Sequence, residues 1–303
     1  MRGPVAWLSR LSARRAISRP APLPVVAVGS LSTGGTGKTP TVIALAQRLA
    51  GQGREVHVVT RGDGAAVRIN EREHRAEEVG DEPLLIAAFS PTWTALDALE
   101  GINAAKAAGA EVVVLDGGVP DGTVSATLNI LVEDAVRGFG NGRVRPFGPL
   151  KTSLQQGLTH ADLLISIGPK QAQERFAASV ETGIAQSFGR LVPLQTGMTW
   201  SGMRVYAFAG IGVPERFFAT LHDAGAEIVA RHALTDHQEL TAALMTRMER
   251  EAWALGAQMV TTEKDAVRLP TDMRRKVLVL PVRMELDDWA PVDAQLLSLF
   301  DPA

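Results

Sequence analysis

The chain has 303 residues, a formal net charge of −2 and 46% hydrophobic residues. This length allows one large domain or two modest ones, and the near-neutral charge gives no bulk attraction for nucleic acid, so no nucleic-acid partner is expected. The absence of cysteine excludes disulfides and thiolate metal sites, and it fits a reducing compartment.

The first 20 residues form a basic segment. It holds five arginines and no acidic residue, and Trp7, Leu8 and Leu11 could share one helical face. A helix of this kind can lie on an anionic membrane surface, although it lacks the roughly 20 apolar residues that would span one. The alternatives are a frayed basic leader and a helix that docks on its own domain.

A strand, a glycine-rich loop and a helix then follow in the order of a phosphate-binding loop. The apolar run at 25–29 predicts a buried strand, residues 30–37 form the loop, and the pattern over 38–51 predicts a helix. Glycines let successive N–H groups point at one anion, and the helix directs its positive end at the same place. The residues expected to bind a nucleoside triphosphate are Gly34, Gly35, Thr36, Gly37, Lys38 and Thr39.

Two residues of this loop supply its chemistry. Lys38 can contact the β- and γ-phosphates, and Thr39 can offer a hydroxyl to Mg²⁺. The strict pattern G-x-x-x-x-G-K-[ST] requires glycine where this chain has Ser32. The alternative is that the glycines form only a tight connection.

Beyond the loop, strand-like runs alternate with helical ones. The expected strands are at 55–60, 111–115, 128–132, 163–167, 205–209, 227–230, 258–261 and 277–280. The expected helices are at 82–89, 99–108, 214–224 and 238–254. This rhythm predicts an α/β fold, a P-loop NTPase-like parallel sheet covered by helices on both faces. The pattern weakens over 185–202, where we expect a domain boundary before a smaller C-terminal α/β part.

Acidic residues stand at the ends of two predicted elements. Asp81 and Glu82 precede Pro83 at an expected helix start, where they can cap the helix or, in an ATP site, hold Mg²⁺ and accept a proton. Asp116 ends an apolar strand, which is where phosphate-transfer sheets place a carboxylate that reaches Mg²⁺. The alternative for Asp116 is that it only starts the turn into two glycines.

Residues 137–157 form a loop rich in glycine, arginine and proline. Interleaved glycines and cations suit an anionic ligand, and the alternative is a solvated basic loop. The candidate substrate contacts in this loop are Arg137, Asn141, Arg143 and Lys151.

Two further candidate segments follow strands of the C-terminal part. His237 comes after Asp236 and is either catalytic or structural. Glu263 and Lys264 lie directly after the strand at 258–261, where they can bind a nucleobase or cap the next helix.

These segments together resemble one family, the tetraacyldisaccharide 4′-kinases of Gram-negative lipid A synthesis. The resemblance runs in order over nearly the whole chain, and the family usually has threonine at the position of Ser32. The motifs that carry it are V-G-S-L-S-T-G-G-T-G-K-T-P (28–40), G-D-E-P (80–83), R-G-F-G-N-G-R (137–143), G-P-L-K (148–151), A-G-I-G-V-P-E-R-F-F (209–218), D-H-Q (236–238) and T-E-K-D-A-V (262–267).

The resemblance implies transfer of the γ-phosphate of ATP to the 4′-hydroxyl of a lipid-linked disaccharide 1-phosphate. It implies that Asp81 works with His237 to activate this hydroxyl, that Lys38 balances charge, and that Glu82 and Thr39 bind Mg²⁺. It also implies that the protein lies peripherally on the cytoplasmic face of the inner membrane. No obligate protein partner is evident.

The expected organisation has three parts. Residues 1–20 form the basic N-terminal segment, residues 21–195 form a P-loop kinase core, and residues 196–303 form the C-terminal part that contributes His237 and the T-E-K-D-A-V segment.

The chain departs from the family pattern at the presumed acceptor end. The family usually reads Asp-Asp-Gly-Leu/Phe-Gln-His where residues 116–121 read Asp-Gly-Gly-Val-Pro-Asp, and Pro-Leu-Arg-Glu where residues 149–152 read Pro-Leu-Lys-Thr. A gained carboxylate disfavours an anionic ligand, and lysine cannot replace the bidentate contacts of arginine. Two alternatives therefore stay open: a related kinase with another acceptor and a non-catalytic nucleotide-binding homologue.

Overall fold

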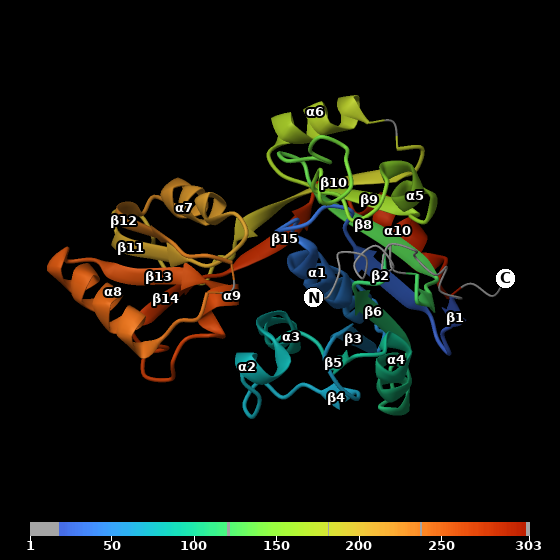
Figure 1. Ribbon diagram of the computed structural model, residues 1–303, viewed down its shortest axis with the longest axis horizontal. Helices are drawn as coiled ribbons and strands as arrows, with labels where there is room; N and C mark the ends of the chain where they lie inside the picture. The colour runs from blue at the N-terminus through green and yellow to red at the C-terminus, as the bar shows by residue number, and fades with distance from the viewer. Residues whose placement is uncertain (1–17, 120–121, 181, 237, 301–303) are drawn as a thin grey trace, which may run out of the picture.

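The structure is a computed structural model that describes residues 18–119, 122–180, 182–236 and 238–300. A nine-stranded sheet and a four-stranded sheet lie side by side, and a two-stranded sheet formed by β1 (Arg19–Pro20) and β7 (Val124–Ser125) adjoins the larger one (Figure 1). The nine-stranded sheet has the order β15 (Val282–Leu286), β10 (Ala185–Pro193), β9 (Leu163–Ile167), β8 (Leu128–Asp134), β2 (Val25–Gly29), β6 (Val112–Asp116), β3 (Val56–Arg61), β5 (Thr92–Ala95), β4 (Val67–Arg68). All of its pairings are parallel except those of the two edge strands β4 and β15.

Strand β2 shows why the central strands of this sheet have continuously apolar sequences. All of its residues are buried, and it pairs in parallel with β6 on one side and β8 on the other. Its alternate side chains enter two different cores, Val26 and Val28 on one face and Val25 and Ala27 on the other. A parallel strand that is covered on both faces therefore needs no polar residue.

Helices cover both faces of the large sheet. On one face lie α1 (Lys38–Gly51), α3 (Asp81–Ala87) and α10 (Ala290–Leu297), and on the other lie α4 (Ala98–Ala107), α5 (Leu154–Thr159) and α6 (Lys170–Ser179). Helix α1 buries Val42, Leu45, Ala46 and Leu49, which repeat at the spacing of one helical face. The short α2 (Ala76–Val79) precedes α3. The predicted α/β fold with helices on both faces is thus confirmed.

The four-stranded sheet has the order β12 (Glu227–Ala233), β11 (Arg204–Ala209), β13 (Gln258–Thr262), β14 (Val277–Leu280) and is parallel throughout. Helix α7 (Pro214–Asp223) packs aromatic side chains on one face and α8 (Ala242–Ala254) packs methionines on the other. The short helix α9 (Glu263–Ala266) follows β13 directly and lies against α3 of the large part. The expected smaller α/β part is present.

The chain passes twice between the two sheets. It leaves the large sheet after β10, and it returns from β14 into β15, which pairs antiparallel with β10. Val292 and Leu296 of α10 then complete the core around β2 and α1. The predicted domain division at residue 195 stays a prediction. The strand pairing and the core contacts show that residues 282–300 pack with the large sheet.

Most of the strands and helices expected from the sequence are present within one to three residues of their predicted ends, and helix α8 begins four residues later than expected. The sequence analysis did not predict the nine-residue strand β10, which residues 185–193 form within the segment where the pattern weakens. Its sequence, A-Q-S-F-G-R-L-V-P, is polar and contains glycine, so it lacks the usual strand pattern. Backbone hydrogen bonds to β9 and β15 stabilise it as a strand.

Candidate functional site

The loop after β2 has the geometry of an anion cradle. Gly34 and Gly37 have φ angles of 95° and 90°, which side chains other than glycine rarely adopt. A β-carbon on Gly37 would also clash with Ile167, whereas the space beside Gly35 is open. Helix α1 begins at Lys38 without a side-chain cap, so its first N–H groups and its positive end are available to phosphate.

Lys38 and Asp116 form an ion pair at the edge of this cradle. The lysine side chain is 25% exposed and the aspartate is buried at the end of β6. Burial lowers the pKa of Lys38, but the charges of Asp116 and Glu82 outweigh this effect and hold it above its usual value. Burial raises the pKa of Asp116, against the opposing charge of Lys38. The predicted Lys38, Asp116 and Glu82 thus lie within electrostatic reach of one another.

The turn after Asp116 is built from two glycines that no other residue replaces easily. Gly117 and Gly118 have φ angles of 116° and 85°, and the Gly117 amide donates to the carbonyl of Val28 at 2.8 Å. Asp116 therefore begins a turn and also pairs with Lys38 of the phosphate loop. Its predicted contact with Mg²⁺ stays a prediction.

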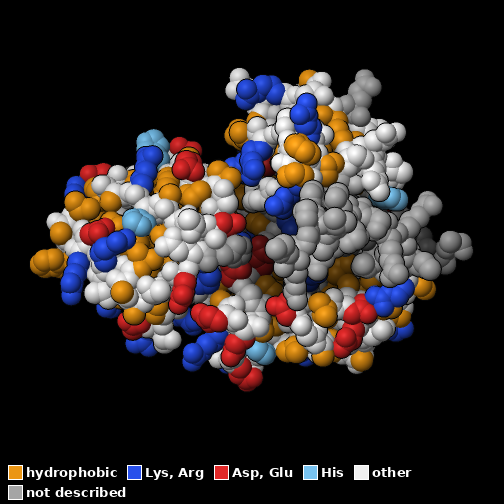
Figure 2. Space-filling model, in the orientation of Figure 1, with side chains coloured by type: hydrophobic (Ala, Val, Ile, Leu, Met, Phe, Trp, Pro, Cys, Tyr) orange, Lys and Arg blue, Asp and Glu red, His pale blue; other side chains and the backbone are white. Residues whose placement is uncertain are grey.

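Helix α3 presents its first two residues to the four-stranded part. Asp81 is 7% exposed, and its Oδ2 lies 3.7 Å from Arg268 Nε and 3.9 Å from Lys264 Nζ. Glu82 Oε1 lies 3.1 Å from the same lysine nitrogen. The structure thus brings together the predicted Asp81, Glu82 and Lys264 from segments 182 residues apart. Figure 2 shows acidic side chains in the furrow between the two parts.

Arg268 is a site residue that the sequence analysis missed. Its guanidinium donates to the carbonyls of Gln238 and Gly210, at 2.8 and 3.3 Å, and pairs with the fully buried Asp265. Asp265 in turn accepts a hydrogen bond from the Gly210 amide at 3.0 Å. Arg268 therefore connects Asp81 to the segments that follow β11, β12 and β13 of the small sheet. No local sequence pattern indicates this arrangement.

His237 lies outside the described residues, so its predicted partnership with Asp81 stays a prediction. Its neighbour Gln238 is part of the cluster just described. The adjacent turn is held by Gln238 Oε1, which accepts from both the amide and the hydroxyl of Thr235 at 3.1 Å.

Glu263 has partners that hold the two parts of the chain together. Its carboxylate accepts from Arg283 Nη1 at 2.9 Å and from the Val282 amide at 3.0 Å, and the Arg283 guanidinium lies 4.5 Å from the ring centre of Phe89. These contacts give Glu263 a structural role at the start of β15. Its predicted contact with the nucleotide stays a prediction.

The basic loop is bound to the phosphate loop at its base. The Thr33 amide donates to Pro149 O at 3.1 Å, and the Lys151 amide donates to Leu31 O at 2.8 Å. A β-carbon on Gly34 would lie 2.8 Å from Arg137 Nη1, so the Arg137 guanidinium covers the cradle.

Asn141 stabilises the basic loop itself. Its Nδ2 donates to Phe147 O at 2.9 Å, and its Oδ1 accepts from the Arg143 amide at 3.1 Å. Arg143 is exposed near the far end of the loop. The predicted substrate contacts of Asn141, Arg143, Arg137 and Lys151 stay predictions.

A buried carboxylate that the sequence analysis did not select supports the start of the phosphate loop. Glu133 on β8 has no exposed surface, and its Oε1 accepts from the Leu31 and Ser32 amides at 2.5 and 3.0 Å. Burial raises the pKa of Glu133 to about 7, against the opposing effect of these hydrogen bonds and of Lys151. Its Oε2 is buried without a hydrogen-bond partner.

The start of α7 and the turn before it contact the large part beside the phosphate loop. Arg216 at the start of α7 pairs with the buried Asp134 at the end of β8. In the preceding turn, a β-carbon on Gly212 would lie 3.0 Å from the Gly35 amide nitrogen. The turn before α7 therefore borders the cradle directly.

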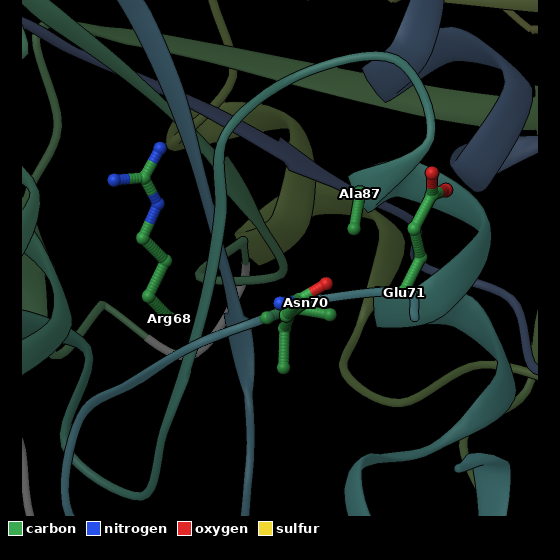
Figure 3. A pocket seen from close by; sticks show the side chains of 5 residues that line it. Arg68, Asn70, Glu71 and Ala87 are labelled. Carbon is green, nitrogen blue, oxygen red and sulfur yellow. The ribbon is translucent and has the colours of Figure 1, made fainter. Parts of the chain in front are cut away.

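One hollow elsewhere takes no part in this arrangement. It measures about 470 Å³ and is lined by β4, the turn after it and the last residue of α3 (Figure 3). None of the predicted site residues lines it. Within the described part of the chain, no group of three or more His, Cys, Asp or Glu residues is placed to hold a metal. No helix among the described residues is long and apolar enough to cross a membrane.

Comparison with known proteins gives the family. The family model described as tetraacyldisaccharide-1-P 4′-kinase matches residues 4–301. This chain belongs to that family. Relatives named tetraacyldisaccharide 4′-kinase are 51% identical in Dinoroseobacter shibae, over 98% of this chain and 90% of the relative, and 52% identical in a Jannaschia species, over 90% and 85%. The resemblance drawn from the motifs is confirmed.

The fold of this 4′-kinase family member matches a solved structure. LpxK from Aquifex aeolicus in complex with ATP has a TM-score of 0.74 to this chain, at 24% identity over 94% of this chain and 90% of that one. This likeness confirms the fold class.

Replacing Glu133 by glutamine should flatten the dependence of stability on pH. The folded state raises the pKa from 4.5 to about 7, so it binds more protons than the unfolded state, and wild-type stability falls as pH rises from about 4.5 to 7. This fall is about 3 kcal/mol for a shift of this size. Glutamine cannot ionise but keeps the oxygen that accepts from Leu31 and Ser32. Urea unfolding at pH 5 and pH 8 measures the difference, and an unchanged pH dependence in the variant would contradict the assignment.

Replacing Arg216 by alanine should destabilise the protein by about 1–3 kcal/mol, because it leaves the buried Asp134 carboxylate without its cation. The matched control is Arg190→Ala, which breaks an ion pair to Glu285 whose partners are 63% and 56% exposed. That pair should contribute less than about 1 kcal/mol. Equal losses of unfolding free energy in the two variants would refute the importance of the Arg216 contact.

Proposed function

We propose that this protein transfers the γ-phosphate of ATP to the 4′-hydroxyl of a tetraacyldisaccharide 1-phosphate, a precursor of lipid A. The family match over residues 4–301 carries the proposal, together with relatives of that name at 51% and 52% identity. The similar Aquifex aeolicus structure is described as a complex with ATP.

The residues present fit ATP and Mg²⁺. The uncapped start of α1 and the open space at Gly35 suit a phosphate chain. Mg²⁺ prefers oxygen ligands, keeps several waters and needs only one or two carboxylates, so Thr39, Glu82 and Asp116 are a sufficient set of candidate ligands. When bound, the metal would neutralise charge on the β- and γ-phosphates.

Lys38 supplies the mobile positive charge of the site. In the structure Asp116 holds the ammonium at the cradle and Glu82 adds negative charge nearby. On binding, a triphosphate offers the ammonium a stronger partner than one carboxylate, and the lysine then stabilises charge that develops on the transferring phosphoryl group.

Asp81 acts as the general base toward the acceptor hydroxyl, with His237 as its partner. The position of Asp81 supports this role, because it is buried at the furrow and oriented by Arg268 and Lys264. A fixed carboxylate at that position can accept the hydroxyl proton as the phosphoryl group moves. The basic loop, through Arg137, Arg143 and Lys151, provides cations for the anionic glycolipid, and Asn141 keeps this loop in shape.

We also propose that the reaction takes place peripherally at the cytoplasmic face of the inner membrane, because the acceptor is a lipid and the N-terminal segment is basic.

Phosphate transfer from γ-labelled ATP to the disaccharide 1-phosphate in detergent with Mg²⁺ tests the proposal. We expect a labelled lipid. ATP binding with labelled product only in a crude lipid extract would favour another acceptor, to which the altered 116–121 segment already points. ATP binding with no labelled lipid of any kind would favour a non-catalytic homologue.

A further inference from the structure

The loop between β8 and α5 exposes large apolar side chains. Phe147 is 76% exposed, Val136 is 60% exposed and Val144 is 37% exposed. Three of the ten exposed large hydrophobic residues in the described chain therefore fall within one short segment, which we call the 136–149 loop. Isolated exposed apolar residues need no explanation, but a group of them on one loop indicates a contact surface.

All charged residues of this loop are cations. No aspartate or glutamate occurs from residue 135 to residue 151, although the whole chain has a net charge of −2. The arginines at 143 and 145 flank Val144, and Phe147 follows two residues later. On the face shown in Figure 2, hydrophobic and cationic side chains adjoin on the nine-stranded part. Aromatic and aliphatic groups beside arginine are the composition that binds an anionic lipid–water interface.

The loop holds this surface in a fixed shape. Asn141 links its two sides through Phe147 O and the Arg143 amide. The Leu150 amide donates to Arg143 O at 3.1 Å, and Phe139 anchors the base against Phe176 with ring centres 5.1 Å apart. Phe147 is thus exposed on an ordered loop, which lowers the entropic cost of inserting it into another phase.

The position of the loop relates this surface to the reaction. Its base hydrogen-bonds to the phosphate loop at Thr33 and Leu31, and Arg137 covers Gly34. The loop therefore connects the phosphate loop, at its base, with the exposed apolar and cationic residues at its far end.

We propose that the 136–149 loop docks on an anionic membrane, with Phe147 and Val144 entering the interface and Arg145 contacting lipid phosphates. This inference rests on the proposed function, because the acceptor hydroxyl must come from a lipid for the docking to serve the reaction. The loop brings the cradle to the membrane surface and so shortens the path of a membrane-bound acceptor to the transferred phosphate.

The absence of cysteine allows a site-specific test with the full chain. Phe147→Cys and Trp253→Cys are each labelled with an environment-sensitive fluorophore and mixed with vesicles of phosphatidylglycerol and phosphatidylcholine. Trp253 is the matched control, because it is 85% exposed on α8 of the small part. We expect a blue shift at position 147 and none at position 253, with a weaker response on phosphatidylcholine alone. An unchanged emission at position 147 would overturn the proposal.

A binding measurement complements the label. Phe147→Ser and Arg145→Gln should each weaken vesicle binding by roughly fivefold to tenfold, whereas Trp253→Ser should not. Phe147→Ser should retain ATP binding and transfer in detergent, which shows that the variant is folded. Vesicle binding by Phe147→Ser at the wild-type level would contradict the docking role. Absence of transfer by the wild type in detergent would instead count against the proposed function. The fluorescence at position 147 would still show whether the loop enters the membrane interface.

Discussion

Replacing Lys38 by methionine should lower the rate of phosphate transfer by about 10²–10³-fold, the usual effect of removing one preorganised group that stabilises transition-state charge. Methionine keeps the length of the side chain and removes only the ammonium. The loss should appear in kcat more than in the affinity for ATP, because the backbone N–H groups of the cradle still bind the phosphates. Steady-state kinetics at varied ATP concentration measure both quantities.

The variant also leaves the buried Asp116 without its cation, so loss of activity could reflect loss of structure. Unfolding in urea and ATP binding by the purified variant separate these cases. Lys170→Met is the matched control, because this lysine is exposed at the start of α6 and makes no ion pair with Asp116. A Lys38→Met protein that is folded and transfers phosphate at the control rate would exclude the role assigned to Lys38.

Replacing Asp81 by asparagine should lower kcat by about 10²–10⁴-fold, which is the contribution of a positioned general base. Asparagine has the same shape and can keep the hydrogen bond that Asp81 Oδ1 accepts from the Glu82 amide at 3.0 Å. The KM for ATP should change little, because Asp81 acts on the acceptor hydroxyl. Transfer assays at saturating ATP measure the effect.

The neighbouring Glu82 provides the contrast. As a metal ligand, its replacement by glutamine should raise the Mg²⁺ concentration needed for half-maximal rate, and an excess of Mg²⁺ should restore part of the activity. Asp81→Asn should not respond to added Mg²⁺. If the two variants show the same dependence on Mg²⁺, the division of roles between Asp81 and Glu82 is wrong.

The central strands and helix α1 of the large sheet could be predicted because each shows its burial pattern within its own short stretch of sequence. Strands β2 and β6 are continuous apolar runs, the pattern of strands buried on both faces, and α1 carries its apolar face at helical spacing. Strand β10 could not be predicted, because its mixed sequence becomes a strand only between β9 and β15, and β15 lies about 90 residues later in the chain.

In the candidate site, too, the features encoded by short motifs could be predicted, and those that depend on distant segments could not. The phosphate loop and Asp116 could be predicted from short motifs at strand ends. Arg268 and Glu133 could not, because their roles depend on long-range packing. Arg268 reaches Asp81 only when α9 lies against α3, and Glu133 reaches Leu31 only because β8 lies next to β2. A glutamate at the end of an apolar strand otherwise indicates no more than a strand end.

The position of the transferred phosphate tests the central claim most directly. The purified protein is incubated with γ-labelled ATP, Mg²⁺ and tetraacyldisaccharide 1-phosphate, and the lipid product is then heated in mild acid, which releases the anomeric 1-phosphate but not a phosphate ester at the 4′-hydroxyl. The account predicts a labelled lipid that keeps its label after this treatment and that forms about 10²–10³-fold more slowly with the Lys38→Met protein. A label released by mild acid, or no labelled lipid from a protein that binds ATP, would contradict it.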